Sequence, residues 1–313
     1  MYYCTHVLPH GAVQTKKIQL QLTVVSDSLA LASTMSTQPI IGREESSKLH
    51  KLFDAKAYLN ARYRFGDSPD VFRLLFPLQQ FHKFYKPLPT GLKILEYGCG
   101  PVPAFLISAA PHASEIVMAE FAEVNRKAIR RWVEKDPRAF DWSPHFDHVV
   151  QKLEGKGEEE ARKREEQLRK AIKAIVFCDL KEEELIEKGY EGPYDIIATS
   201  GCIEAGCESL EHCIKVVRKL SSFLKAGGRM VISIVDYKPE ILGKHFMYPV
   251  GSEQFPHLAL TADFVTSALE DAGFSNVTVE RSERASGDDF SKAKWKCPAE
   301  WVGAAFVTGI KPN

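Results

Sequence analysis

The sequence lacks any apolar run approaching the roughly 18 residues that a membrane span requires. It also lacks an excess of either charge, since 41 Lys and Arg residues balance 41 Asp and Glu residues in a chain of 313. Balanced charge gives no electrostatic reason to bind nucleic acid or an acidic membrane surface. We therefore expect neither a nucleic-acid partner nor a membrane partner.

A disulfide pattern is absent as well. The seven cysteines are odd in number and form no C-x-x-C pair, which is typical of free thiols in a reducing compartment. We accordingly expect a monomeric, cytoplasmic protein. Cys202, Cys207 and Cys213 cluster, but no histidine lies at zinc-ligand spacing. Small buried side chains are the better interpretation, and we expect no metal site.

The clearest motif that is present spans residues 93–101, where an apolar strand pattern ends in Glu96 and breaks into Gly98 and Gly100. Such a pattern is typical of a buried parallel strand that enters a tight turn. Neither glycine has a Cβ, so the backbone can approach a ligand closely. Because a carboxylate already stands beside the loop, we expect a positively charged ligand rather than a phosphate.

S-adenosylmethionine (SAM) fits this expectation, since it has an ammonium, a sulfonium and no phosphate. The alternative is a strand-to-helix turn in some other α/β enzyme, because Pro103 stands where the third glycine of a dinucleotide fingerprint would be.

Acids follow other strand patterns too. Glu120 ends the second strand pattern about twenty residues after the glycines, where it can take both hydroxyls of a ribose. Asp179 ends the third pattern and is well placed for the exocyclic amine of adenine. Glu204 follows the fourth pattern, and ligands of open α/β sheets bind outside the carboxyl ends of the strands. A helix cap or a surface group is the alternative for each acid.

The order of the patterns predicts an α/β fold, because five β–α units in a row favour a mainly parallel sheet. The stretch 237–260 follows the fifth strand and reads as one long loop, which is usually a functional lid. Four aromatic residues within 53–65 fit a short helix over a pocket, or else core anchors. The main helices are expected at 68–85 with Ser68 as N-cap, 122–135, 158–172, 209–224 and 261–272, and the later strands at 174–178, 194–199, 229–235, 276–280 and 301–310.

These motifs resemble one family, the small-molecule N-methyltransferases that act on nicotinamide, phenylethanolamine, indolethylamine and thioethers. The resemblance covers about residues 53–310, and its most specific mark is the sequence AFDWSP at 139–144. It implies a Rossmann-like SAM-methyltransferase fold with a seven-stranded, mostly parallel sheet, helices on both faces, a reversed last strand and an N-terminal helical lid. The other marks are Tyr58-Leu59-x-x-x-Tyr63-x-Phe65, Gly98-Cys99-Gly100-Pro101, Cys178-Asp179 and Cys202-Ile203-Glu204-Ala205.

The sequence also predicts a domain plan. Residues 1–45 would be a disordered extension with Met35 as the usual start, so that residues 1–34 are an extension or a translation artefact. Residues 46–313 would form the methyltransferase domain, with a cap at 46–90 and the core at 91–313.

Site residues are carried over by position. The cofactor SAM, and its product S-adenosylhomocysteine, would contact Tyr58, Tyr63, Glu96, Gly98, Gly100, Glu120, Phe121, Asn125, Asp179, Leu180 and Ser200. The methyl acceptor would contact Tyr58, Glu204, Asp236, Tyr248 and Asp288. Two positions depart from the nicotinamide enzymes, which have a tyrosine in place of Ala104 and a serine in place of Pro256. Glu204 followed by alanine, together with Asp288, looks more like the phenylethanolamine enzyme.

The sequence therefore predicts a SAM-dependent N-methyltransferase of a small amine, phenylethanolamine- or indolethylamine-like. An alkylamine is mostly protonated near pH 7, so a carboxylate would help to remove its proton. We expect Glu204 as that catalytic group and Asp288 to hold the amine. A pyridine or thioether acceptor, whose lone pair is free, is the alternative enzyme. A catalytically inactive homologue that binds SAM is the alternative of another class.

Overall fold

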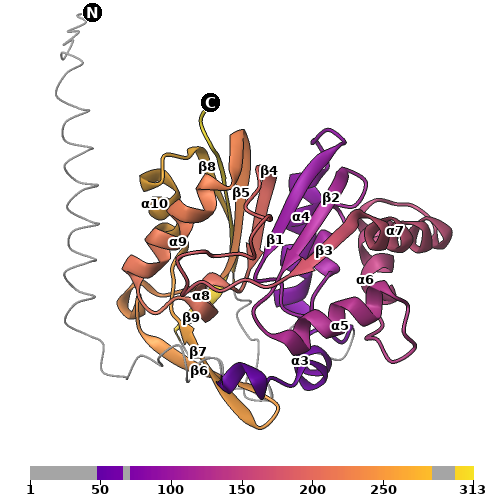
Figure 1. Ribbon diagram of the computed structural model, residues 1–313, viewed down its shortest axis with the longest axis horizontal. Coiled ribbons are helices and arrows are strands. Elements are labelled where there is room, and N and C mark those ends of the chain that lie inside the picture. Colours follow the sequence, from indigo (N-terminus) through magenta and orange to yellow (C-terminus); the bar gives the residue numbers. More distant parts are fainter. Residues whose placement is uncertain (1–47, 66–70, 284–299) are drawn as a thin grey trace, which may run out of the picture. The chain divides into compact units, whose positions relative to one another are not determined.

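A seven-stranded sheet in the order β3-β2-β1-β4-β5-β9-β8 is the centre of the fold (Figure 1). The computed structural model describes residues 48–65, 71–283 and 300–313. Strands β1 to β5 are parallel to one another, whereas β9 runs antiparallel to both of its neighbours, β5 and β8. The predicted mostly parallel sheet with a reversed last strand is confirmed. The strands are β1 (Leu92–Tyr97), β2 (Ala113–Ala119), β3 (Ile172–Val176), β4 (Tyr194–Ser200), β5 (Leu224–Tyr237), β8 (Ser275–Glu283) and β9 (Trp301–Ile310).

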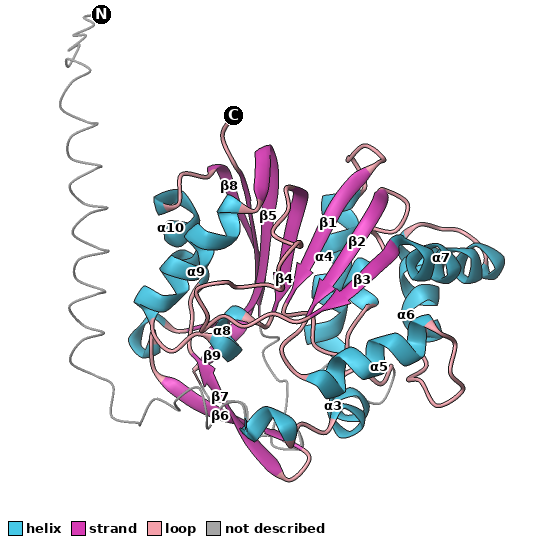
Figure 2. Cartoon of the chain, in the orientation of Figure 1, coloured by secondary structure: helices cyan, strands magenta, loops and turns pink. Residues whose placement is uncertain are grey.

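Helices connect these strands (Figure 2). Within the described residues the α-helices are α3 (Ala55–Arg62), α4 (Val71–Tyr85), α5 (Glu123–Val133), α6 (Ser143–Asp147), α7 (Glu158–Ala171), α8 (Ile203–Gly206), α9 (Leu210–Ser222) and α10 (Ala262–Asp271). Most helix ends lie within three residues of the predicted ones. The predicted N-cap Ser68 lies outside the described residues.

The core occupies both faces of the sheet. On one face Ile94, Ile116 and Ile196 pack with α4 in a single cluster. The alternate residues Leu95 and Val117 are fully buried as well and point to the opposite face, because successive side chains of a strand alternate. Helices α9 and α10 contact β5. The prediction of helices on both faces is therefore confirmed.

The stretch 237–260 is not the irregular loop that the sequence predicts. It contains a short 3₁₀ turn and a hairpin of β6 (His245–Val250) and β7 (Glu253–Leu258). Aromatic residues at alternate positions pair across this hairpin: Tyr248 stands opposite Phe255 and Phe246 opposite His257. Aromatic residues at alternate positions on both sides of a Gly-Ser turn indicate two strands. The prediction of one loop over the whole stretch misses this hairpin.

The hairpin and α3 lie at the carboxyl ends of the parallel strands. Asp54 begins α3, since its Oδ1 accepts a hydrogen bond from the Ala57 backbone N–H at 2.9 Å. Helix α3 contacts β6 and α5, and Figure 1 shows these elements beyond the ends of β1 and β2. The short helix over this end of the sheet thus has the place predicted for an N-terminal lid.

Candidate active site

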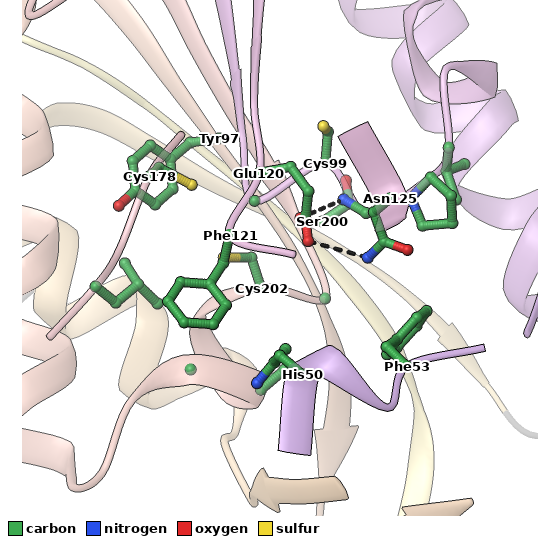
Figure 3. A pocket seen from close by; sticks show the side chains of 18 of the residues that line it. His50, Phe53, Tyr97, Cys99, Glu120, Phe121, Asn125, Cys178, Ser200 and Cys202 are labelled. Carbon is green, nitrogen blue, oxygen red and sulfur yellow. Dashed lines mark hydrogen bonds between the residues drawn. The ribbon is translucent and has the colours of Figure 1, made fainter. Parts of the chain in front are cut away.

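A cavity of about 870 Å³ opens at the carboxyl ends of β1, β2 and β4 (Figure 3). Ten of the eleven residues predicted to contact a cofactor line it. They are Tyr58, Tyr63, Gly98, Gly100, Glu120, Phe121, Asn125, Asp179, Leu180 and Ser200. These residues come from α3 and the position after it, from α5, from the end of β4 and from the loops that follow β1, β2 and β3, so only the folded sheet brings them together.

The glycine loop after β1 forms one wall of the cavity. Gly98 and Gly100 have φ angles of +66° and +56°, which side-chain-bearing residues rarely adopt. A Cβ on Gly98 would lie 1.9 Å from Cys202 Sγ, so Gly98 is needed for the close approach of the loop after β4. A Cβ on Gly100 would meet no atom within 4 Å. The loop therefore leaves open space beside Gly100.

Glu120 joins the glycine loop to the start of α5. Its Oε2 accepts a hydrogen bond from the Gly100 backbone N–H at 2.9 Å. Its Oε1 accepts from the Ala122 backbone N–H at 2.9 Å. The same atom accepts from Asn125 Nδ2 at 3.0 Å (Figure 3). A carboxylate can accept about four hydrogen bonds, so Oε2 keeps room for one from a ligand.

Two buried polar atoms on the cavity wall, Asn125 Oδ1 and Ser200 Oγ, have no hydrogen-bond partner among the described residues. Buried polar groups are almost always hydrogen-bonded, which points to a polar ligand in this cavity. Asp179 faces it from the third strand, with Oδ1 accepting from the Lys181 backbone N–H at 2.9 Å. Open space, two acids and two unpartnered atoms suit a ligand with hydroxyl and amine groups.

Glu96 is the predicted cofactor residue that does not line the cavity. Its neighbour Tyr97 does, and successive strand residues point to opposite faces. Glu96 is 1% exposed, and burial raises its pKa to about 8. Near neutral pH it is therefore mostly protonated. The acids that the cavity presents are Glu120 and Asp179, not Glu96.

Two smaller cavities, of about 670 and 590 Å³, adjoin the first. All three share Tyr58 and Gly201 as wall residues. Glu204 lines both smaller cavities; it is 1% exposed, and its Oε1 accepts a hydrogen bond from the Val235 backbone N–H at 3.2 Å. Tyr248 lines the cavity of about 590 Å³. Tyr58, Glu204 and Tyr248, which are predicted to contact the acceptor, thus line adjoining cavities.

Asp236 does not face these cavities, although the sequence predicts that it does. Its neighbours in β5, Val235 and Tyr237, line them instead. Asp236 accepts a hydrogen bond from the Ala262 backbone N–H at 2.8 Å, next to the start of α10, and pairs with Arg281 Nε at 3.3 Å. The alternation of side chains along β5 explains the error. Asp288, the other predicted acid, lies outside the described residues.

Sequence reasoning missed several cavity residues. Arg62 lines both smaller cavities, and His257 lines the one of about 590 Å³. His50 lines the cavity of about 870 Å³. Arg62 stands four residues after Tyr58 in α3, so the helical i,i+4 spacing could have placed both on one face. No spacing pattern indicates His257, because the sequence predicts a loop where the structure has β7.

In the described ranges, no group of three or more His, Cys, Asp and Glu residues is placed to hold a metal ion. No helix in that part of the chain is long and apolar enough to cross a membrane.

Comparisons with known proteins agree on one family. The sequence model of the NNMT/PNMT/TEMT family matches residues 42–294. Human nicotinamide N-methyltransferase is 31% identical over 231 residues, which cover 71% of this chain and 82% of that protein. Rabbit (Oryctolagus cuniculus) indolethylamine N-methyltransferase is also 31% identical over 231 residues, covering 72% and 83%. Pig (Sus scrofa) phenylethanolamine N-methyltransferase is 32% identical over 145 residues, covering 46% and 50%.

Proposed function

Because the chain belongs to the NNMT/PNMT/TEMT family, we propose that it transfers a methyl group from SAM to the nitrogen of a small amine. The relatives at about 30% identity are N-methyltransferases of nicotinamide, indolethylamine and phenylethanolamine. The observation that carries the proposal is the meeting of three cavities at Tyr58 and Gly201. One cavity suits a nucleoside cofactor, and the two beside it present the carboxylate of Glu204.

SAM, when bound, supplies a methyl group on a sulfonium. We place it in the cavity of about 870 Å³, where Glu120 Oε2 would accept a hydrogen bond from a ribose hydroxyl. Asn125 Oδ1 lies buried beside Glu120 and would accept from the ligand as well. Asp179 would accept from the adenine amine. Ser200 Oγ, on the side of the smaller cavities, would donate to the methionine carboxylate.

Glu204 has the position for a proton acceptor. The nitrogen of an alkylamine must lose its proton before it can attack a methyl group, and a carboxylate promotes that loss. The hydrogen bond from the Val235 backbone N–H holds one oxygen of Glu204, and burial fixes the side chain in the cavity wall. We propose that Glu204 binds the ammonium and takes its proton, directly or through a water molecule. Positioning of the two reactants supplies most of the rate.

The proposal also covers the oligomeric state, the cellular location and the domain bounds that the sequence predicts. We propose a monomer in the cytoplasm, and the cysteines that are free in the described residues support a reducing compartment. We also propose residues 46–313 as the catalytic domain.

The experiment is turnover of labelled SAM against phenylethanolamines, indolethylamines, nicotinamide and a thioether, between about pH 6 and pH 10. We expect N-methylation of amines, with a rate that rises with pH. Activity on nicotinamide or the thioether alone would discard the role of Glu204 as a base. Binding of SAM without turnover of any acceptor would contradict the proposal and favour an inactive homologue.

A further inference from the structure

Arg62 is a cation in the wall of the acceptor cavities. It is the last residue of α3 and is half-buried. Its guanidinium carbon lies 5.5 Å from the ring centre of Tyr58 and 5.4 Å from that of Tyr248. Both distances suit a cation–π contact. The two rings come from α3 and β6, so the hairpin and the helix together hold the guanidinium at the cavities.

The described walls of the acceptor cavities present one charge of each sign. Among the described residues that line either cavity, Arg62 is the one Lys or Arg and Glu204 the one Asp or Glu. The carboxylate of Glu204 attracts an ammonium group, and the guanidinium of Arg62 attracts an anionic group. A molecule with an ammonium and an anionic group complements both charges. A guanidinium is well matched to a carboxylate, because its planar N–H groups can donate two parallel hydrogen bonds.

The remaining walls suit an aromatic ring. Tyr237, Phe246 and Tyr248 line the cavity of about 590 Å³, and the rings of Tyr237 and Phe246 are stacked with an angle of 5° between their planes. Walls that are mostly aromatic, with a few polar groups, are typical of small-molecule sites. Desolvation by burial raises the pKa of the Tyr248 hydroxyl, so the ring stays neutral.

From this arrangement we infer that the acceptor is an aromatic amine that also carries a carboxylate, and that Arg62 binds the carboxylate while Glu204 binds the amine. The inference rests on the proposed function and narrows its substrate class. It makes Arg62 a specificity-determining residue, and it predicts that decarboxylated analogues are the poorer acceptors.

Matched pairs of acceptors test the inference, because tryptophan and tryptamine, or tyrosine and tyramine, differ only in the carboxylate. For the wild-type enzyme we expect kcat/KM to favour the acid of each pair by about 10- to 100-fold, the range of a hydrogen bond to a charged group. Arg62→Gln should remove most of this preference. Arg64→Gln is the matched control, since Arg64 is exposed and does not line these cavities; it should keep the preference.

The outcomes separate the inference from the proposed function. Methylation of amines without preference for the acid, or a preference that Arg62→Gln leaves intact, would overturn the inference alone. An equal loss on both members of a pair would mean that Arg62 only holds Tyr58 and Tyr248 in place, which also overturns it. If no acceptor is methylated, the proposed function fails. Calorimetric binding of each pair to the enzyme loaded with S-adenosylhomocysteine then still measures the preference and decides the inference.

Discussion

Substitution of Gly98 by alanine tests the geometry of the glycine loop most sharply. The new Cβ would lie 1.9 Å from Cys202 Sγ and 2.4 Å from Cys202 Cβ. Real side chains do not tolerate such distances, so the loop after β1 or the loop after β4 must move. The first loop carries Gly100 and the second leads into Glu204. Both the cofactor cavity and the acceptor cavities should therefore be disturbed.

The expected loss of stability in Gly98→Ala has two parts. Residue 98 has a φ of +66°, and a side chain in that left-handed conformation costs about 1–2 kcal/mol. Overpacking of a buried contact costs about 1–3 kcal/mol more. We expect Gly98→Ala to lower the free energy of unfolding by about 2–5 kcal/mol. Gly100→Ala is the control, since it has a similar φ of +56° but no atom within 4 Å of the new Cβ; its stability loss should be limited to the backbone part.

Urea unfolding of a double-mutant cycle separates the two parts. Cys202→Gly removes both clashing atoms and leaves Cys202 Cα at 3.7 Å. In the Cys202→Gly background, Gly98→Ala should therefore cost only about 1–2 kcal/mol. The reasoning is refuted if Gly98→Ala costs the same in both backgrounds, or if it costs no more than Gly100→Ala in the wild type.

Three further predictions concern residues around the site. Burial raises the pKa of Glu96 from 4.5 to about 8, so the stability that its protonated carboxyl contributes is present below about pH 4.5 and is lost as the pH rises towards 8. Urea unfolding of the wild type should therefore show a loss of up to about 5 kcal/mol in the free energy of unfolding over this range. Glu96→Gln should show a flatter pH profile and greater stability above pH 8. Asp236→Asn should lower the free energy of unfolding by about 1–3 kcal/mol, because it weakens the contacts to Arg281 and Ala262, and it should leave the KM for an amine unchanged. A large rise in this KM would mean that Asp236 does contact the acceptor. Tyr58→Ala should raise the KM of both SAM and the acceptor in steady-state assays, because Tyr58 borders all three cavities; an effect on one substrate alone would contradict this.

Features that depend on local pattern could be predicted from the sequence. Each parallel strand is an apolar run followed by a polar residue, and this pattern predicted the carboxyl end of each strand. Glu120 and Asp179 follow their strands, and both line the cavity because the carboxyl ends of parallel strands meet at one edge. The glycine pattern predicted a tight turn after β1, and Gly98 and Gly100 have positive φ angles there.

Features that depend on the face of a strand or on pairing across space could not be predicted in the same way. Glu96 and Asp236 lie near the ends of their strands, where a shift of one residue moves a side chain from the cavity to the opposite face. The contact of Arg62 with Tyr248 joins α3 to β6, nearly two hundred positions apart in a sequence of 313. Such a contact follows from the packed hairpin, and no local signal indicates it.

The pH dependence of kcat/KM for wild type and Glu204→Gln, measured on the best amine acceptor, tests the central claim most directly. The account predicts that Glu204→Gln lowers kcat/KM near pH 7 by about 10²- to 10⁴-fold, the usual contribution of a general base, and that the loss shrinks at high pH, where the amine is already neutral. Glu211→Gln, at an exposed position on the next long helix, should match the wild type. Unchanged turnover by Glu204→Gln across the pH range would contradict the account.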